Sequence, residues 1–177
     1  MTQTSLPRLL DALAFAAHKH RDQRRKGADA VPYVNHPIAV AQVLASEGAI
    51  TDETALMAAI LHDTIEDTET TADELRDRFG EHVMAVVLEV TDDKTLRKEE
   101  RKALQIEHAA GLSHAARLVK LADKICNVRD MGTQPPTNWP LTRVREYFDW
   151  AKAVVDQLRG THAGLEAAFD EAYRPRP

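Results

Sequence analysis

An apolar segment that runs directly into a cluster of ionisable residues constrains the fold of this chain more than any other feature. Residues 55–61 are all apolar, and residues 62–67 read His-Asp-Thr-Ile-Glu-Asp. The apolar run predicts a buried helix, on which side chains three or four positions apart share a face. We therefore expect Glu66 to lie over His62 and Asp63. Because buried carboxylates are costly unless a cation or hydrogen bonds compensate them, the segment predicts a metal centre.

The rest of the chain is also helical in pattern. Apolar stripes at helical spacing predict helices over residues 5–23, 37–48, 53–66, 71–79, 81–91, 98–108, 115–131, 142–158 and 164–173. No stretch alternates polar and apolar residues between turn signals, so no sheet is expected. The chain has 177 residues, 44% of them apolar, which is enough for one hydrophobic core. We expect one all-α domain over residues 1–177, a helical bundle.

Composition and charge argue against several functional classes. A net charge of −5 argues against a nucleic-acid partner, which requires a basic face. No apolar run is long enough to span a bilayer, and the first residues do not resemble an export signal, so we expect a cytoplasmic protein without a membrane partner. The single cysteine, Cys126, excludes an internal disulfide and a cysteine-based zinc site.

One short segment is basic despite the acidic total. It contains Lys19, Arg21, Arg24, Arg25 and Lys26, opposed by Asp22. A run of this kind is most often a solvated helix end. Because it lies shortly before His36, a candidate metal ligand, it could instead supply positive charge to an anionic ligand.

Four side chains from three predicted helices form a candidate metal shell. His36 precedes Pro37 at the start of one helix, His62 and Asp63 end the apolar helix, and Asp123 lies on the polar stripe of a later helix. Two imidazoles and two carboxylates, with no thiolate, favour Mn²⁺, Fe²⁺ or a catalytic Zn²⁺. Such an ion lowers the pKa of bound water and polarises a phosphoryl oxygen, which suits hydrolysis of a phosphate ester.

Glu66 and Asp67 are left outside this shell, so they could orient a water molecule or accept its proton. Taken singly, each candidate also has an ordinary structural explanation. His36 could cap a helix, Asp123 could form a surface ion pair with its neighbouring lysines, and Asn127 could be an exposed polar residue. Three motifs occur together: Asn35-His36-Pro37, His62-Asp63-x-x-Glu66-Asp67 and Leu121-Ala122-Asp123-Lys124-x-x-Asn127. Their combination favours a functional site over these explanations.

The motifs resemble those of the HD phosphohydrolase superfamily and, within it, the RelA/SpoT family. The resemblance covers nearly the whole chain and is closest to the stand-alone small alarmone hydrolases. The segments that carry it are Arg24-Arg25-Lys26-Gly27, Tyr33-Val34-Asn35-His36-Pro37, Leu61-His62-Asp63-Thr64-Ile65-Glu66-Asp67-Thr68, Val90-Thr91-Asp92-Asp93-Lys94, Lys120-Leu121-Ala122-Asp123-Lys124-Ile125-Cys126-Asn127 and Arg143-Val144-Arg145-Glu146-Tyr147.

This resemblance implies an all-α HD-domain fold with one Mn²⁺ per site. It implies a 3′-pyrophosphohydrolase that converts ppGpp or pppGpp to GDP or GTP and pyrophosphate, lowering the alarmone of the stringent response. The implied metal ligands are His36, His62, Asp63 and Asp123, and the implied catalytic pair is Glu66 and Asp67. The residues implied to contact the substrate are Arg24, Arg25, Lys26, Asn127, Arg143 and Tyr147.

Three questions stay open from the sequence. The same pocket could serve a phosphatase acting on another phosphorylated nucleotide such as NADPH, since metal, water and cations recognise phosphate more than base. A non-catalytic alarmone-binding protein is a further alternative, against which the intact pair Glu66 and Asp67 argues. The region of Trp139 and the C-terminal helix could complete the pocket rim or form a homodimer interface.

Overall fold

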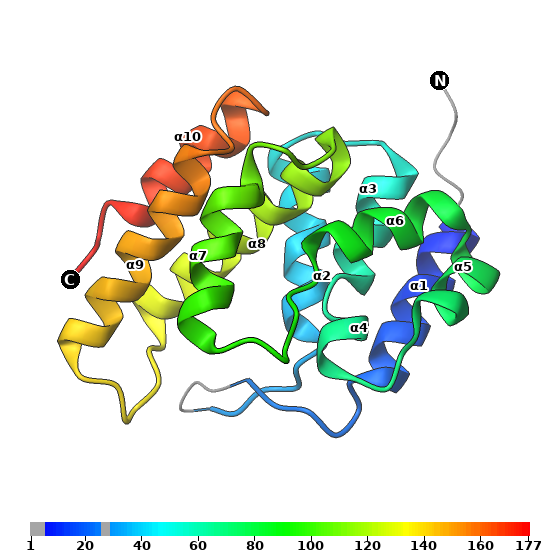
Figure 1. Ribbon diagram of the computed structural model, residues 1–177, viewed down its shortest axis with the longest axis horizontal. Coiled ribbons are helices and arrows are strands. Elements are labelled where there is room, and N and C mark those ends of the chain that lie inside the picture. Colours follow the sequence, from blue (N-terminus) through cyan, green and yellow to red (C-terminus); the bar gives the residue numbers. More distant parts are fainter. Residues whose placement is uncertain (1–5, 26–28) are drawn as a thin grey trace.

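The computed structural model describes residues 6–25 and 29–177, and this part of the chain is all-α (Figure 1). The helices are α1 (Leu6–Lys19), α2 (Asn35–Gln42), the π-helical continuation η1 (Val43–Glu47), α3 (Glu53–Leu61), α4 (Thr64–Asp67), α5 (Ala72–Phe79), α6 (Glu81–Val90), α7 (Lys98–Ala109), α8 (His114–Thr133), α9 (Leu141–Asp156) and α10 (Ala163–Tyr173). Among the described residues no strand forms, apart from an isolated antiparallel bridge between Arg24 and Pro32.

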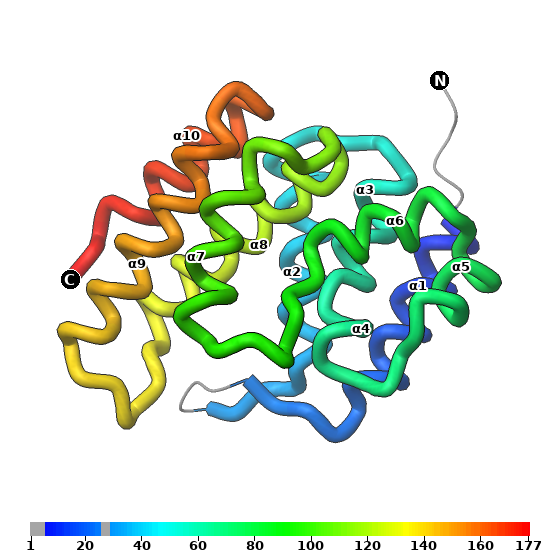
Figure 2. The backbone as a smooth tube through the Cα atoms, viewed as in Figure 1, coloured from blue at the N-terminus to red at the C-terminus, as the bar shows by residue number. Residues whose placement is uncertain are grey.

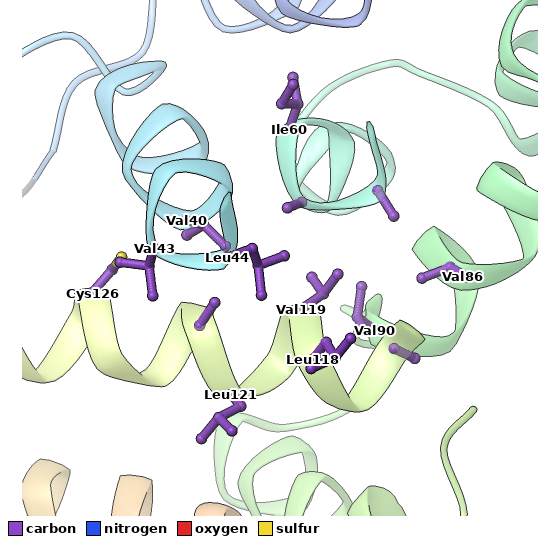
Figure 3. Packing of buried hydrophobic residues seen from close by; sticks show 14 of the residues in the cluster. Val40, Val43, Leu44, Ile60, Val86, Val90, Leu118, Val119, Leu121 and Cys126 are labelled. Atoms are coloured by element: carbon purple, nitrogen blue, oxygen red, sulfur yellow. The ribbon is translucent and has the colours of Figure 1, made fainter. Parts of the chain in front are cut away.

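Helix α3 lies at the centre of the bundle, as its composition predicts. Its residues 55–61 are all buried, and α1, α2, α6 and α8 pack around it. Helices α9 and α10 lie at one end of the molecule, with α1 and α5 at the other (Figure 2). The core between them is continuous: Val40 and Leu44 of the α2–η1 helix face α8 near Val119, beside Val90 at the end of α6 (Figure 3). This packing places the ends of α3, α6 and α8 close together.

Local sequence signals account for the helix starts. The side chains of Asp52, Thr71 and Ser113 accept hydrogen bonds from the third residue beyond them, at 2.7, 3.2 and 3.3 Å, and so cap α3, α5 and α8. Thr71 and Glu74 have the sequence spacing of a capping box, in which Glu74 would bind the Thr71 amide. The Glu74 carboxylate instead binds Lys19 Nζ at 3.0 Å. From α6 onward, the boundaries agree with the predicted ones within two residues, because these helices carry clear apolar stripes.

The predicted helix over residues 5–23 is too long, since α1 ends at Lys19. After it the chain turns and doubles back on itself. The amide of Arg25 donates to the Val31 carbonyl at 2.9 Å, and the amide of Tyr33 donates to the Gln23 carbonyl at 3.0 Å. These bonds replace helical ones and bring Arg25 and Tyr33 toward α2.

The prediction of one uninterrupted helix over residues 53–66 is wrong. Helix α3 ends at Leu61, His62 and Asp63 form a turn, and α4 begins at Thr64. The physical cause is local, because the Thr64 hydroxyl donates to the Leu61 carbonyl at 2.6 Å and competes with the backbone for that acceptor. The break turns the catalytic candidates that follow onto a separate short helix. Helix α2 also begins earlier than predicted, at Asn35, which places His36 and Pro37 within its first turn.

Candidate functional site

The candidate site residues line one cleft of about 890 Å³. It is lined by α2, the α3–α4 turn and α8, and by residues 23–25 and 31–33, α7 and α9. The predicted residues found in it are Arg24, Arg25, His36, His62, Asp63, Glu66, Asp67, Asp123, Asn127, Arg143 and Tyr147. Lys26, predicted to contact the substrate, lies outside the described residues.

Three of the four predicted metal ligands meet in the cleft, and the fourth, Asp63, lies beside them. One ligand atom each from His36, His62 and Asp123 lies within 4.8 Å of the others. His36 Nε2 is 3.0 Å from Asp123 Oδ1, and His62 Nε2 is 3.8 Å from the same oxygen. Asp63 Oδ2 lies 3.1 Å from His62 Nε2 and 3.9 Å from His36 Nε2. Residues from three separated segments thus bring two ring nitrogens and one carboxylate together, with the Asp63 carboxylate next to the His62 ring.

His62 gives the clearest sign that this point suits a cation. Its Nδ1 lies 2.8 Å from the Ala59 carbonyl, which orients the ring so that Nε2 faces the carboxylates. Buried Nε2 makes no well-directed hydrogen bond to any described residue. Burial lowers the pKa of His62, but Asp63 and Asp123 outweigh it and raise that pKa to about 9. The two carboxylates therefore stabilise positive charge at this point, which a proton or a metal ion can supply. The donor set fits a divalent ion.

Hydrogen bonds hold the two carboxylate ligands in place. The Tyr33 hydroxyl donates to Asp63 Oδ2 at 2.6 Å. Asn127 Nδ2 donates to Asp123 Oδ1 at 2.6 Å, and Lys124 Nζ donates to Asp123 Oδ2 at 3.0 Å. Burial alone would raise the pKa of Asp123, yet Lys124 and the histidines hold it well below its usual range. Burial alone would likewise raise the pKa of Asp63, but His62 outweighs it and lowers that pKa. Both carboxylates are thus oriented, and their ionised forms are favoured.

Glu66 lies beside this cluster rather than in it. Its Oε2 accepts a hydrogen bond from the Asp92 amide at 3.0 Å, and its Oε1 lies 3.8 Å from Arg101 Nη1 and 3.9 Å from Lys94 Nζ. Burial raises the pKa of Glu66, and the nearby carboxylates add to that effect. Asp67 pairs with Lys94 closer to the surface. A carboxylate of raised pKa next to a metal site is a suitable proton acceptor.

Cations and aromatic rings form the opposite walls. Arg25 Nη2 donates to Asn127 Oδ1 at 3.2 Å and to Asp130 Oδ2 at 2.6 Å, which ties residues 23–25 to α8. The Arg143 guanidinium lies 4.0 Å above the Trp139 ring, and Tyr147 packs between Trp139 and Trp150 at centroid distances of 6.0 and 5.3 Å. Arg24 lines the rim with an exposed side chain.

Several cleft residues were not among the sequence candidates. They are Tyr33, Lys98, Arg101, Lys102, Gln105, Lys120, Lys124 and Trp150. Four of them recur on α7 at positions 98, 101, 102 and 105, which is the spacing of one helical face. That polar face could have been found in the sequence, but nothing local indicated that it turns toward the metal ligands.

This arrangement can bind a divalent cation, hold an anionic ligand between cationic walls and place a carboxylate near the bound ion. Those are the requirements of metal-assisted hydrolysis of a phosphate ester. The model of the HD domain matches residues 12–147, well over half of the chain. Fold and site thus define an HD-domain protein.

Comparison with known proteins shows which family of HD-domain proteins this chain resembles. The chain is 54% identical over 168 residues to the mouse protein guanosine-3′,5′-bis(diphosphate) 3′-pyrophosphohydrolase MESH1, covering 95% of this chain and 94% of that protein. The Drosophila melanogaster protein of the same name is 52% identical, over 96% and 94%. The chain therefore belongs to the HD domain family and, within it, to the family of the MESH1 proteins.

Solved structures agree with this assignment. The structure described as a metazoan ortholog of SpoT that hydrolyzes ppGpp superposes with a TM-score of 0.94 at 51% identity, covering 99% of this chain and 98% of that one. The Listeria monocytogenes protein lmo0812 superposes with a TM-score of 0.65 at 30% identity, over 80% and 95%. The predicted HD-domain fold is confirmed. Within the described residues, no helix combines the length and apolarity that crossing a bilayer requires.

Proposed function

We propose that this protein is a metal-dependent guanosine-3′,5′-bis(diphosphate) 3′-pyrophosphohydrolase, which splits ppGpp or pppGpp into pyrophosphate and GDP or GTP. The observation that carries the proposal is the position of Glu66 in the cleft, beside the histidine–aspartate cluster but outside it. A protein that only binds a nucleotide has no use for a spare, half-buried carboxylate there. The names of the similar proteins supply the substrate.

In this proposal His36, His62, Asp63 and Asp123 hold one divalent ion, which we take to be Mn²⁺. When bound, such an ion lowers the pKa of a water molecule and polarises a phosphoryl oxygen. A shell of imidazoles and carboxylates without thiolates suits Mn²⁺. The orientation of His62 by the Ala59 carbonyl and of Asp63 by Tyr33 supports this assignment.

The protein's own groups then perform the remaining tasks. Glu66 accepts a proton from the attacking water, and Asp67, paired with Lys94, supports it from the surface side. Arg24, Arg25 and Lys26 provide positive charge for the diphosphates, in keeping with a cationic wall in an acidic protein. Asn127 binds near the ribose and the 3′-phosphate. Arg143 and Tyr147 hold the far end of the substrate.

The decisive experiment is one incubation of the purified protein with Mn²⁺ and ppGpp, followed by ³¹P NMR. We expect equal amounts of pyrophosphate and GDP. Release of orthophosphate without pyrophosphate would contradict the proposal. A parallel incubation with NADPH at the same Mn²⁺ concentration tests the alternative phosphatase, which requires orthophosphate from the 2′-phosphate. Binding of ppGpp without turnover would indicate the non-catalytic alternative.

The identity of the physiological ion is tested by comparing Mn²⁺, Fe²⁺, Zn²⁺ and Mg²⁺ at equal free concentrations, with the highest turnover expected for Mn²⁺. A homodimer and a cytoplasmic location stay predictions of the sequence. Sedimentation equilibrium and fractionation of the source cells would test them.

A further inference from the structure

Lys120 on α8 is an unusual residue for the interior of this protein. Its side chain lines the cleft but is only 7% exposed, whereas lysine is rarely buried unless a carboxylate pairs with it. Its Nζ donates to the backbone carbonyl of Val90 at 3.0 Å, inside the protein. Burial and Lys124 lower the pKa of Lys120, while Asp123, Asp92 and Glu66 oppose that shift. Lys120 is thus close enough to these three carboxylates to interact with them electrostatically, although its hydrogen bond goes to a backbone carbonyl.

The carbonyl that Lys120 binds belongs to a short segment at the end of α6. Residues 90–92, here called the strap, are the last residue of α6 and the two residues that follow it, so the Val90 carbonyl lacks a helical partner. The next part of the strap reaches the catalytic candidate, because the Asp92 amide donates to Glu66 Oε2 at 3.0 Å. Gln105 of α7 holds the strap from the other side through Asp92 Oδ2 at 2.7 Å.

The contacts form a continuous path from α8 to Glu66. Lys120 fixes the start of the strap, and the end of the strap fixes one oxygen of Glu66. Val90 itself packs in the core next to Val119, the residue that precedes Lys120, so the start of the strap is also held by apolar contacts (Figure 3). Among the described residues, the other Glu66 oxygen is approached by the cations of Lys94 and Arg101 at the longer distances of 3.9 and 3.8 Å. The Asp92 amide is therefore the main group that orients this carboxylate.

We infer that Lys120 is a positioning residue for Glu66, acting through the strap in the hydrolysis proposed above. Its ammonium holds the Val90 carbonyl, which aligns the Asp92 amide and thereby aims the carboxylate of Glu66. A neutral side chain could also bind a free carbonyl at the end of α6. The Thr91 hydroxyl does so by donating to the Val87 carbonyl at 2.8 Å. Placing a cation at this point adds a positive field beside Glu66, which favours the ionised base.

The inference rests on the proposed function and is tested by Lys120→Met, which keeps the length of the side chain and removes the ammonium. We expect kcat for ppGpp to fall on the order of 100-fold, the effect of a catalytic group misplaced by about 1 Å. KM and the dissociation constant of Mn²⁺ should stay within about twofold, since Lys120 is not assigned to either the substrate or the metal. Lys120→Arg, which restores charge and donor, should recover most of the lost kcat.

Ser113→Ala is the matched control, because it removes the cap of the same helix and destabilises the protein without touching the strap. Its kcat should equal that of the wild type. A readout independent of turnover is amide hydrogen exchange at Asp92, which should accelerate in Lys120→Met and not in Ser113→Ala.

The outcomes separate this inference from the proposed function. A wild-type protein that releases no pyrophosphate from ppGpp would refute the proposed function. In that case, an unchanged rate of amide exchange at Asp92 in Lys120→Met would also refute the path through the strap. With an active wild type, an unchanged kcat in Lys120→Met would overturn the inference. So would a loss of Mn²⁺ affinity that accounts for the loss of activity, or an equal fall of kcat in Ser113→Ala.

Discussion

Single hydrogen bonds orient two of the proposed metal ligands. His62 is aimed by one backbone carbonyl, that of Ala59, and Asp63 by one hydroxyl, that of Tyr33. The Ala59 carbonyl binds the ring nitrogen of His62 that does not face the carboxylates, whereas the Tyr33 hydroxyl binds Asp63 Oδ2, the oxygen that lies nearest to His62. Groups that orient metal ligands in this way tune affinity even though they do not touch the ion.

Tyr33→Phe removes the hydroxyl and leaves the ring. We expect the dissociation constant of Mn²⁺ to rise about 10-fold, because Asp63 loses the bond that orients it. Titration of free Mn²⁺ by electron paramagnetic resonance measures this. Tyr173→Phe is the control, since its hydroxyl binds Asp149 on the surface, and its affinity should match that of the wild type. Equal affinity for Mn²⁺ in both variants would show that the Tyr33 hydroxyl is not required to orient Asp63.

Glu66→Gln tests the proton acceptor. The amide keeps the size of the side chain but cannot take a proton, so we expect kcat to fall by about 10²- to 10⁴-fold with Mn²⁺ binding retained. Steady-state release of pyrophosphate and a parallel Mn²⁺ titration check both parts. Glu69→Gln is the control, because Glu69 is exposed and pairs with Lys19 outside the cleft. Activity close to that of the wild type in Glu66→Gln would exclude Glu66 as the base.

At the scale of elements, the site is built at helix ends and interruptions. The turn between α3 and α4 carries His62 and Asp63, and the end of α6 reaches Glu66. A further interruption is the π-helical turn η1, which ends at Glu47 and is followed by Gly48. A Cβ there would lie 2.8 Å from the Leu44 carbonyl oxygen and 3.2 Å from Leu165 of α10. Only glycine lets the end of η1 pack this closely against α10.

Gly48→Ala should therefore destabilise the fold by about 1–3 kcal/mol, the usual cost of forcing an atom into a packed interior. Urea denaturation followed by circular dichroism measures the change. Gly111→Ala is a matched control, because the nearest atom to its added Cβ is the His108 carbonyl oxygen at 3.5 Å, an ordinary contact. A Gly48→Ala protein as stable as Gly111→Ala would mean that η1 can shift at little cost.

At the scale of the whole molecule, one ion would join elements that are distant in sequence. His36 lies on α2, Asp63 follows α3 and Asp123 lies on α8. The His36 imidazole already faces both carboxylates. An ion that binds only this assembled arrangement stabilises the entire fold by mass action.

Metal removal should consequently lower the melting temperature. At free Mn²⁺ of about 100 times its dissociation constant the gain is about 2.7 kcal/mol, which for a chain of this size corresponds to roughly 5–10 °C. Thermal scans over a Mn²⁺ series, with chelator as the zero point, provide the test. Asp123→Asn should show little of this shift, and a wild-type melting temperature independent of Mn²⁺ would contradict metal binding at the site.

Much of the architecture follows from local sequence. The apolar segment 55–61 predicts a buried helix, and Thr71 and the stripes after residue 81 predict helix starts and ends within two residues. The break after Leu61 was not predicted, because it depends on which acceptor the Thr64 hydroxyl selects. The early end of α1 likewise depends on backbone pairing between residues 23–25 and 31–33, which no periodicity reveals.

The sequence by itself determined the helical class and the motifs with ligand chemistry, because periodicity and residue type are local properties. Only the tertiary structure decided that the polar face of α7 turns toward those motifs, and that Tyr33 and Lys120 support Asp63 and Glu66. These pairings join residues far apart in the chain. Their geometry depends on how the helices pack around α3, and packing is a property of the whole core rather than of any one segment.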